Sequence, residues 1–256
     1  MVMIMASFHD PAFHDRAAAR RFPGPDYLEV LDWIHQALRP ETYVEIGVLA
    51  GGSLRIARPS TVAVGIDPGT RGVTGVAARV FSMTSDEFFA QYDLRQVLGG
   101  RPVDFALIDG LHLFEQAFAD FLKLERYAGP GTVIALHDTI PLDQETSARE
   151  RTTEFYTGDV WKTVAYLRQN RPDLRMITVR TAPTGLTLIR NLDPEWAQRE
   201  GAGREPAPLD WDYYVRHHAE FLGLAPNDRE VVESFCQKTA VQSTGSRGVE
   251  IPSRSR

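Results

Sequence analysis

Cysteine is nearly absent from this sequence, since Cys236 is the only one in 256 residues. A single thiol excludes an internal disulfide framework and a zinc site built from cysteines. The sequence also has no apolar run that approaches the roughly 20 residues needed to span a bilayer. Its start, "MVMIMASFHD", has none of the basic residues that open a signal peptide. We therefore expect a soluble, cytoplasmic protein with no membrane partner.

The sequence also lacks any run of positive charge. It has 34 acidic residues against 28 Lys and Arg, which gives a formal charge of −6, and its arginines are scattered. Binding of nucleic-acid phosphates needs a basic face, so nucleic acid is not expected as a partner. A hydrophobic content of 43% is enough for a substantial core. Length and composition together indicate one α/β domain with extensions.

Short β-branched runs alternate with longer amphipathic segments along the middle of the chain. Near-continuous apolar strands with helical crossovers indicate a parallel sheet that is covered on both faces. The last two strands are separated only by "TAPT", which is too short for a crossover helix, so this pair is expected to be antiparallel. We predict an α/β fold with a doubly wound, seven-stranded, mostly parallel sheet and an antiparallel last strand. The predicted strands are 43–47, 62–66, 79–81, 103–108, 133–136, 174–180 and 185–190.

Helical spacing of apolar residues predicts the segments between and beyond these strands. The first helix lies between Pro25 and Pro40, and the others are expected at 53–57, 86–98, 114–127, 160–170, 211–222 and 227–239. The near-duplicate "FHDPAFHD" precedes them and suggests either metal binding or, as we favour, a mobile arm or lid. The predicted division is an N-terminal arm, a main domain, a linker with a helical extension and a disordered tail, at 1–24, 25–193, 194–242 and 243–256.

Polar residues stand at the carboxyl ends of all five predicted parallel strands. In open α/β sheets, ligands bind outside these ends. Any one acid there could instead cap the helix that follows, but five strand ends in order favour a shared binding site. The residues at or just after these ends are Glu45, Gly47, Asp67, Ser85, Asp86, Asp109, His112, His137 and Asp138.

The first turn, "VEIGVLAGGSLRIA", has a glycine pattern of its own. Gly47 and Gly51 allow close approach of the backbone, and Ser53 is placed to cap the next helix. The dinucleotide fingerprint G-x-G-x-x-G is missing, which speaks against a nicotinamide dehydrogenase. The wider turn E-x-G-x-x-x-G-x-S suits a ligand without a pyrophosphate. Asp67, at the end of the second strand, is where an acid can bind both hydroxyls of a ribose.

Five segments together resemble a known family: "YVEIGVLAGGSLRIA", "VGIDPG", "TSDEFF", "DFALIDGLHLFEQAFADF" and "GPGTVIALHDT". They are similar to class I S-adenosylmethionine-dependent methyltransferases, and most of all to the group with small-molecule O-methyltransferases that act on macrolide sugars. The similarity runs from about residue 43 to 190. It implies S-adenosylmethionine as cofactor and methyl transfer to a hydroxyl of a small-molecule acceptor, such as a sugar or a glycosylated natural product.

The resemblance also implies roles for single residues on the cofactor side. Asp67 would bind the ribose hydroxyls. Ser85 and Asp86 would lie beside the adenine, and Asp109 would also adjoin the cofactor. The residues implied for the pocket around the methionine and ribose portions are Glu45, Gly47, Gly51 and Ser53.

On the reacting side, Asp109 and Asp138 fall at the family's divalent-metal positions and His112 at the position of a general base. Metal-dependent relatives have a second acid where this chain has His137. Imidazole suits transition metals better than Mg²⁺, so Mg²⁺, a transition metal or no metal all stay open. A divalent ion on these residues would lower the pKa of the acceptor hydroxyl, and His112 would take its proton. Without a metal, His112 or His137 would act as the base.

Other readings of the same residues remain. A metal-assisted hydrolase could use Asp109, His137 and Asp138 to activate a water, but it leaves the glycine turn and Asp67 without a purpose. A non-catalytic subunit that binds the cofactor without turnover is another alternative. Trp161 is expected in the core, although it is close enough in sequence to the fifth strand to line an acceptor pocket. Apolar helices outside the sheet make a homodimer reasonable.

Overall fold

The computed structural model describes residues 11–70, 73, 75, 77–200 and 209–237. The predicted disordered tail, 243–256, lies outside the described residues, as do the first three residues of "FHDPAFHD". Within the described part of the chain, no helix is both long and apolar enough to cross a membrane.

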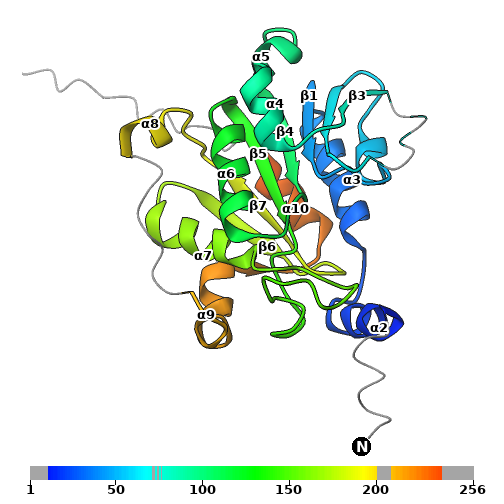
Figure 1. Cartoon of the computed structure of the whole chain (residues 1–256), viewed down its shortest axis with the longest axis vertical. Coiled ribbons are helices and arrows are strands. Elements are labelled where there is room, and N and C mark those ends of the chain that lie inside the picture. Colours follow the sequence, from blue (N-terminus) through cyan, green and yellow to red (C-terminus); the bar gives the residue numbers. More distant parts are fainter. Residues whose placement is uncertain (1–10, 71–72, 74, 76, 201–208, 238–256) are drawn as a thin grey trace, which may run out of the picture.

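An eight-stranded sheet forms the centre of the described structure (Figure 1). Its order is β3-β2-β1-β4-β5-β7-β6-β8, in which the first five strands are mutually parallel and β7 lies antiparallel between β5 and β6. The predicted fold class and the antiparallel last hairpin are confirmed. The strands are β1 Thr42–Ile46, β2 Val62–Ile66, β3 Ala78–Phe81, β4 Val103–Ile108, β5 Ala128–His137, β6 Arg175–Val179, β7 Leu186–Arg190 and β8 Leu224–Ala225.

The sheet has one strand more than predicted. The additional strand, β8, has two residues and pairs parallel with the edge strand β6. It directly follows Gly223, which has φ +58° and ends the preceding helix in the left-handed conformation. Two residues are too few for an alternating pattern, so the sequence carries no strand signal there.

Helices cover both faces of the sheet. Alternate residues of each central strand belong to different cores: in β4, Ala106 and Ile108 face one, and Phe105 and Leu107 face the other. This alternation is the two-residue period of a strand buried on both sides. The helices are α2 Pro11–Arg21, α3 Tyr27–Leu38, α4 Ser85–Gln91, α5 Leu94–Val97, α6 Phe114–Glu125, α7 Trp161–Asn170, α8 Trp196–Glu200, α9 Trp211–Leu222 and α10 Arg229–Cys236, with a 3-10 turn at Leu54–Ile56.

Each face has its own set of helices. Helices α6, α7 and α9 pack on one side, where α6 stands in front of the strands in Figure 1, and α3 with α10 packs on the other. Trp161 of α7 is 1% exposed, so its predicted core position is confirmed. The C-terminal helices α9 and α10, predicted as an extension, contribute to the same two cores as the main domain.

Several predicted helices differ from the structure. The predicted helix at 53–57 is only a 3-10 turn, and Ser53 makes no side-chain capping bond. The predicted helix at 86–98 is broken into α4 and α5, because Asp93 leaves the helical conformation and caps the amide of Arg95. The helix predicted at 227–239 is shorter, ending at Cys236. The described part of the N-terminal arm is helix α2, whose residue His14 is buried.

Candidate active site

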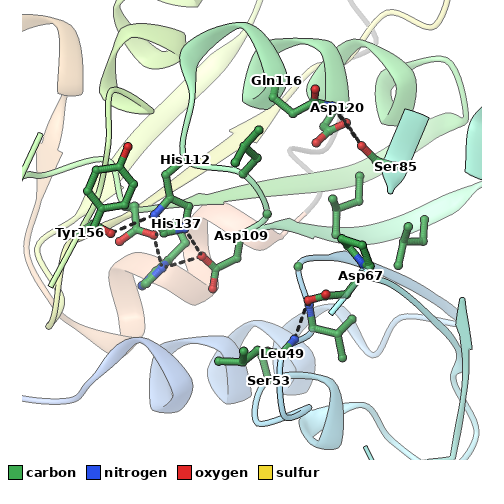
Figure 2. A pocket seen from close by; sticks show the side chains of 18 of the residues that line it. Leu49, Ser53, Asp67, Ser85, Asp109, His112, Gln116, Asp120, His137 and Tyr156 are labelled. Carbon is green, nitrogen blue, oxygen red and sulfur yellow. Dashed lines mark hydrogen bonds and ion pairs between the residues drawn. The ribbon is translucent and has the colours of Figure 1, made fainter. Parts of the chain in front are cut away.

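A cavity of about 780 Å³ lies at the carboxyl ends of β1, β2, β4 and β5. This volume is in the range of small-molecule sites. Figure 2 shows that its labelled side chains form three groups, around Asp67, around Asp120 and around the two histidines. Two predicted site residues, Glu45 and Gly51, do not line it. The predicted residues that do line it are Gly47, Ser53, Asp67, Ser85, Asp86, Asp109, His112, His137 and Asp138.

The first turn is locked to the ends of two strands. Gly47 has φ +89°, and a Cβ there would lie 1.9 Å from the backbone oxygen of Asp109. Only glycine therefore allows the turn after β1 to pass so close to the end of β4. Asp67 accepts hydrogen bonds from the amides of Val48 (2.7 Å), Leu49 (2.8 Å) and Gly69 (2.6 Å). Its carboxylate has lone pairs left for a ligand hydroxyl.

Glu45 supports this turn from below. It is fully buried and accepts hydrogen bonds from the hydroxyls of Tyr43 (2.7 Å) and Ser53 (2.6 Å). Burial raises the pKa of Glu45 to about 7, against the effect of these two donors. The prediction that Ser53 caps a helix is wrong, because its hydroxyl is used by Glu45. Gly51, with φ +75°, shapes the turn without facing the cavity.

The second group joins the start of α4 to α6. The Ser85 hydroxyl donates to Asp120 (2.6 Å), and the Gln116 amide donates to both of them (3.1 Å each). Lys123 pairs with Asp86 and Asp120. Gln116 and Asp120 line the cavity but were missed in the sequence. The sequence signal that could have identified Asp120 is an acid at a buried position of the amphipathic helix "FEQAFADFLKLE". In the structure, burial raises the pKa of Asp120.

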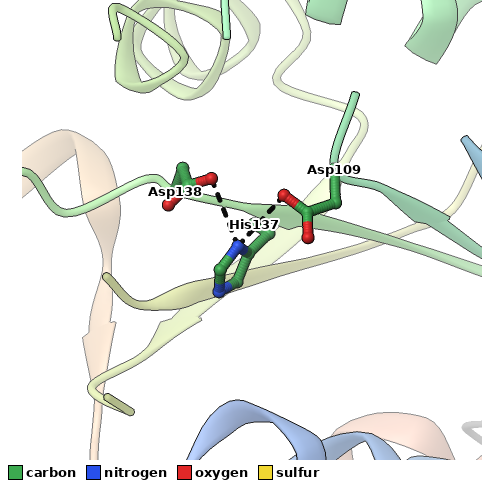
Figure 3. Close-up of side chains that lie close together, drawn as sticks. All are labelled: Asp109, His137 and Asp138. Atoms are coloured by element: carbon green, nitrogen blue, oxygen red, sulfur yellow. Dashed lines mark hydrogen bonds and ion pairs between the residues drawn. The ribbon is translucent and has the colours of Figure 1, made fainter. Parts of the chain in front are cut away.

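The third group is a cluster of two carboxylates and two imidazoles. The Nδ1 atom of His137 lies 3.2 Å from Asp109 Oδ1 and 3.2 Å from Asp138 Oδ2 (Figure 3). The Nε2 atom of His112 lies 3.1 Å from Asp138 Oδ2 and 3.6 Å from Asp109 Oδ1. Asp109 does not cap α6, because the amide of Phe114 donates to Asp159 instead. The structure thus brings the ends of β4 and β5 together as predicted.

His112 and Asp138 are held in place by further contacts. His112 Nδ1 lies 2.9 Å from the carbonyl oxygen of Tyr156, so it carries a proton and donates there, which turns Nε2 toward the carboxylates. Asp138 has φ +59°, a left-handed conformation that is uncommon for a residue other than glycine. The hydroxyl of Thr184 donates to Asp138 Oδ1 (2.6 Å). Such backbone strain is typical of functional sites.

The charges of the cluster stabilise one another. Burial alone would lower the pKa of both histidines, but Asp138 and Asp109 outweigh it and raise the pKa of His112 to about 9. The pKa of His137 lies well above its usual value for the same reason. Burial alone would raise the pKa of Asp109, but His137 and His112 hold it well below its usual range. The His112 imidazole is therefore protonated at neutral pH when the site holds no other charge.

The cluster also has the donor set of a metal site. Asp109, His137 and Asp138 each present one ligand atom, and these atoms lie within 4.8 Å of one another. Two carboxylates with an imidazole suit a divalent transition metal and do not suit Mg²⁺, which prefers oxygen ligands alone. The same geometry also suits a site without metal, in which His137 is an imidazolium that pairs with both carboxylates.

Aromatic residues that the sequence analysis did not single out complete the cavity. The ring of Tyr27 lies on His137, with centroids 4.2 Å apart, and Tyr156 is stacked on His112 at 5.7 Å. In the sequence, Tyr27 has only the spacing of an apolar residue of the helix predicted between Pro25 and Pro40. It reaches the cavity because its amide donates to the carbonyl of Ala182 at the start of the last hairpin turn. No local sequence pattern predicts this long-range contact.

The comparisons with known proteins concern the family and the fold. Residues 44–139, which contain the first turn, Asp67 and the Asp–His cluster, match a family model described as a methyltransferase domain. The chain is similar to this family over that segment. The match confirms the methyltransferase resemblance drawn from the sequence motifs. A comparison with curated protein sequences gives no match.

Solved structures with the methyltransferase domain's fold include cofactor-bound Rv0187 from MTB. It is 19% identical, with a TM-score of 0.50 over 75% of this chain and 91% of that one. An O-methyltransferase from Bacillus cereus in complex with SAH is 16% identical, with a TM-score of 0.48 over 68% and 86% of the two chains. The O-methyltransferase TomG from Streptomyces achromogenes is 18% identical, with a TM-score of 0.47 over 70% and 89%.

Proposed function

We propose that this protein transfers a methyl group from S-adenosylmethionine to a hydroxyl of a small-molecule acceptor. The observation that carries the proposal is that three groups share one cavity: the turn bound to Asp67, the Ser85–Asp120 network and the Asp–His cluster. A nucleoside with a charged sulfonium needs the first two, and deprotonation of an alcohol needs the third. The segment that matches the methyltransferase domain model, residues 44–139, contains all three groups.

The cavity has the charge that such a cofactor needs. Among its lining residues, acids outnumber Lys and Arg, and Asp67, Asp109 and Asp138 stand at the ends of β2, β4 and β5. Negative charge favours the cationic sulfonium of S-adenosylmethionine over the neutral S-adenosylhomocysteine that remains after transfer. The site would therefore bind S-adenosylmethionine more tightly than the product S-adenosylhomocysteine.

The chemistry uses His112 as the base. The acceptor oxygen attacks the methyl carbon in line, a C–O bond forms as the C–S bond breaks, and the hydroxyl proton passes to His112 Nε2. The imidazolium first has to lose its own proton, and the sulfonium charge would lower the pKa of His112 in the loaded enzyme. Asp138 and Asp109 then stabilise the imidazolium that the transfer regenerates.

A metal is not needed for this route. If a divalent transition metal is present, Asp109, His137 and Asp138 would hold it, and it would supply a Lewis acid that lowers the pKa of the acceptor hydroxyl. The metal-assisted hydrolase is not favoured, because it gives no purpose to Asp67 and its turn or to the methyltransferase domain match.

The test is calorimetric titration with S-adenosylmethionine, with EDTA and with added Mn²⁺ or Mg²⁺. We expect micromolar binding that weakens at least tenfold in Asp67→Ala, because a charged hydrogen-bond acceptor contributes about 1.5–3 kcal/mol. Asp212→Ala, an exposed acid in the first turn of α9, is the matched control. Absence of binding in the wild type would refute the methyltransferase proposal. Binding without transfer to any acceptor would favour the non-catalytic subunit.

A further inference from the structure

One wall of the cavity comes from the loop between β5 and α7. Arg151, Glu154, Phe155 and Tyr156 of this loop line the cavity, on the side of the two histidines. Apart from the two charged residues, this wall is aromatic and apolar: Tyr27 lies on His137 nearby, and Leu111, also a lining residue, is 60% exposed. A large apolar side chain exposed in a cavity is covered when an apolar ligand binds.

Arg151 is unusual in this wall. It is the one Lys or Arg among the lining residues, and none of the ion pairs in the described part of the chain involves it. Its guanidinium donates to two carbonyls of its own loop, those of Thr153 (3.2 Å) and Glu154 (2.9 Å). By contrast, the neighbouring Arg149 pairs with Glu115 and Asp159. Arg151 thus brings to this wall a positive charge that forms no ion pair in the described part of the chain, with the carboxylate of Glu154 on the same wall.

Arg151 and the proposed base His112 are linked through the ring of Tyr156. Its Cζ atom lies 5.7 Å from the centroid of the Tyr156 ring, and the same ring is stacked on His112 at 5.7 Å with an angle of 14°. The base and the guanidinium therefore both adjoin one aromatic ring. A planar molecule on this wall can present a hydroxyl to His112 and an anionic group to Arg151.

The loop is held in this conformation by its own contacts. The Tyr156 hydroxyl donates to the carbonyl of Arg149 (2.9 Å), and the Thr153 hydroxyl donates to the carbonyl of Phe155 (2.6 Å). Phe155 is stacked on His14 of α2, with centroids 5.5 Å apart. A wall that is ordered before the ligand arrives loses little entropy on binding and is selective for shape.

We propose that the acceptor is an aromatic hydroxyl compound with an anionic substituent, and that Arg151 is the specificity-determining residue that binds this substituent. The inference rests on the proposed methyl transfer, and it replaces the expected sugar with a planar ring. A guanidinium is suited to this role because it can bind a carboxylate through two parallel hydrogen bonds.

The experiment measures binding to the protein loaded with S-adenosylhomocysteine, so that it does not depend on turnover. The probes are 3,4-dihydroxybenzoate, catechol, which lacks the carboxylate, and glucuronate, which has a carboxylate without the aromatic ring. We expect 3,4-dihydroxybenzoate to bind at least tenfold more tightly than either of the others. Equal affinity for catechol, preference for glucuronate or binding of none of the three would overturn the inference.

The variant Arg151→Gln tests whether Arg151 is the residue that binds the carboxylate of the probe. Its affinity for 3,4-dihydroxybenzoate should fall to that for catechol, while its affinity for catechol stays unchanged. If both affinities fall together, Arg151 only holds the loop and the inference is wrong. Arg216→Gln is the control, since Arg216 is exposed on α9 and donates to a carbonyl of its own helix. Failure to load the wild type would instead remove the proposed function itself.

Discussion

The two sides of the cavity are built by different means. The side around Asp67, proposed to bind the cofactor and called the cofactor side, is fixed by main-chain groups close to it: three amides bind Asp67, and Gly47 touches the end of β4. The side formed by the loop between β5 and α7, proposed to face the acceptor and called the acceptor side, joins parts that are distant in the sequence. There, Arg21 of α2 donates to the carbonyls of Pro141 and Leu142. The first side is thus a property of the sheet, whereas the second depends on tertiary contacts of a loop.

The largest expected effect follows from the tightest main-chain contact. Gly47→Ala should lower the free energy of unfolding by about 3 kcal/mol or more and abolish cofactor binding, because its Cβ would meet the Asp109 carbonyl at 1.9 Å. Gly52→Ala is the matched control, since a Cβ there has nothing within 4 Å. Urea denaturation measures both variants. Equal stability would show that the cofactor side is not rigid.

This contrast explains what could be predicted from the sequence. An apolar run followed by an acid gives both the strand and its end, so the bounds of β2 and β4 and the positions of Asp67 and Asp109 were correct. The roles of these residues toward the cofactor stay predictions. The helix at 53–57 was wrong, because a local pattern does not reveal that Glu45 takes the Ser53 hydroxyl.

The acceptor side was the part that sequence reasoning could not reach. Tyr27 has the spacing of a core residue of α3, and it lines the cavity only because α3 begins beside Ala182. His14 was part of the repeated "FHD" motif, which raised metal binding or a mobile arm. In the structure it is 2% exposed and stacked on Phe155. Both placements come from contacts across more than a hundred residues, and no periodicity records such contacts.

The next largest effect is expected at His112, where a substitution should change the rate of methyl transfer and not the affinity for the cofactor. His112→Gln should lower kcat by about 10²–10⁴-fold, the usual contribution of a general base, and leave the dissociation constant of S-adenosylmethionine within a few-fold. The control is His218→Gln, because His218 also has Nδ1 near a carbonyl of its own helix but lies outside the cavity. A loss of cofactor affinity equal to the loss of kcat would contradict the assignment.

The pH dependence of activity has a definite sign. The pKa of His112 is about 9 in the free protein, so most of the base is protonated at pH 7, and kcat/KM should rise with pH toward that value. A profile that falls over pH 6–9 would exclude His112 as the base.

Stability should change with pH in the opposite direction. Since the folded-state pKa of His112 is raised from 6.5 to about 9, its contribution is fully present below pH 6.5 and is lost as pH rises through 9. We expect a loss on the order of 2–3 kcal/mol in the free energy of unfolding across that window. Urea denaturation at pH 6 and pH 9.5 measures it. His112→Gln should show a smaller change, and an equal change would assign the effect to other groups.

The smallest expected effect tests the acceptor side alone. His14→Ala removes the ring that is stacked on Phe155, a contact of about 0.5–1.5 kcal/mol, and leaves every lining residue in place. The KM for the acceptor should rise several-fold, while the dissociation constant of S-adenosylmethionine stays unchanged. The neighbouring Asp15→Ala, at an exposed position, should change neither. If cofactor affinity falls together with acceptor affinity, the loop and the first turn form one unit. The cofactor side would then depend on α2 as much as the acceptor side does.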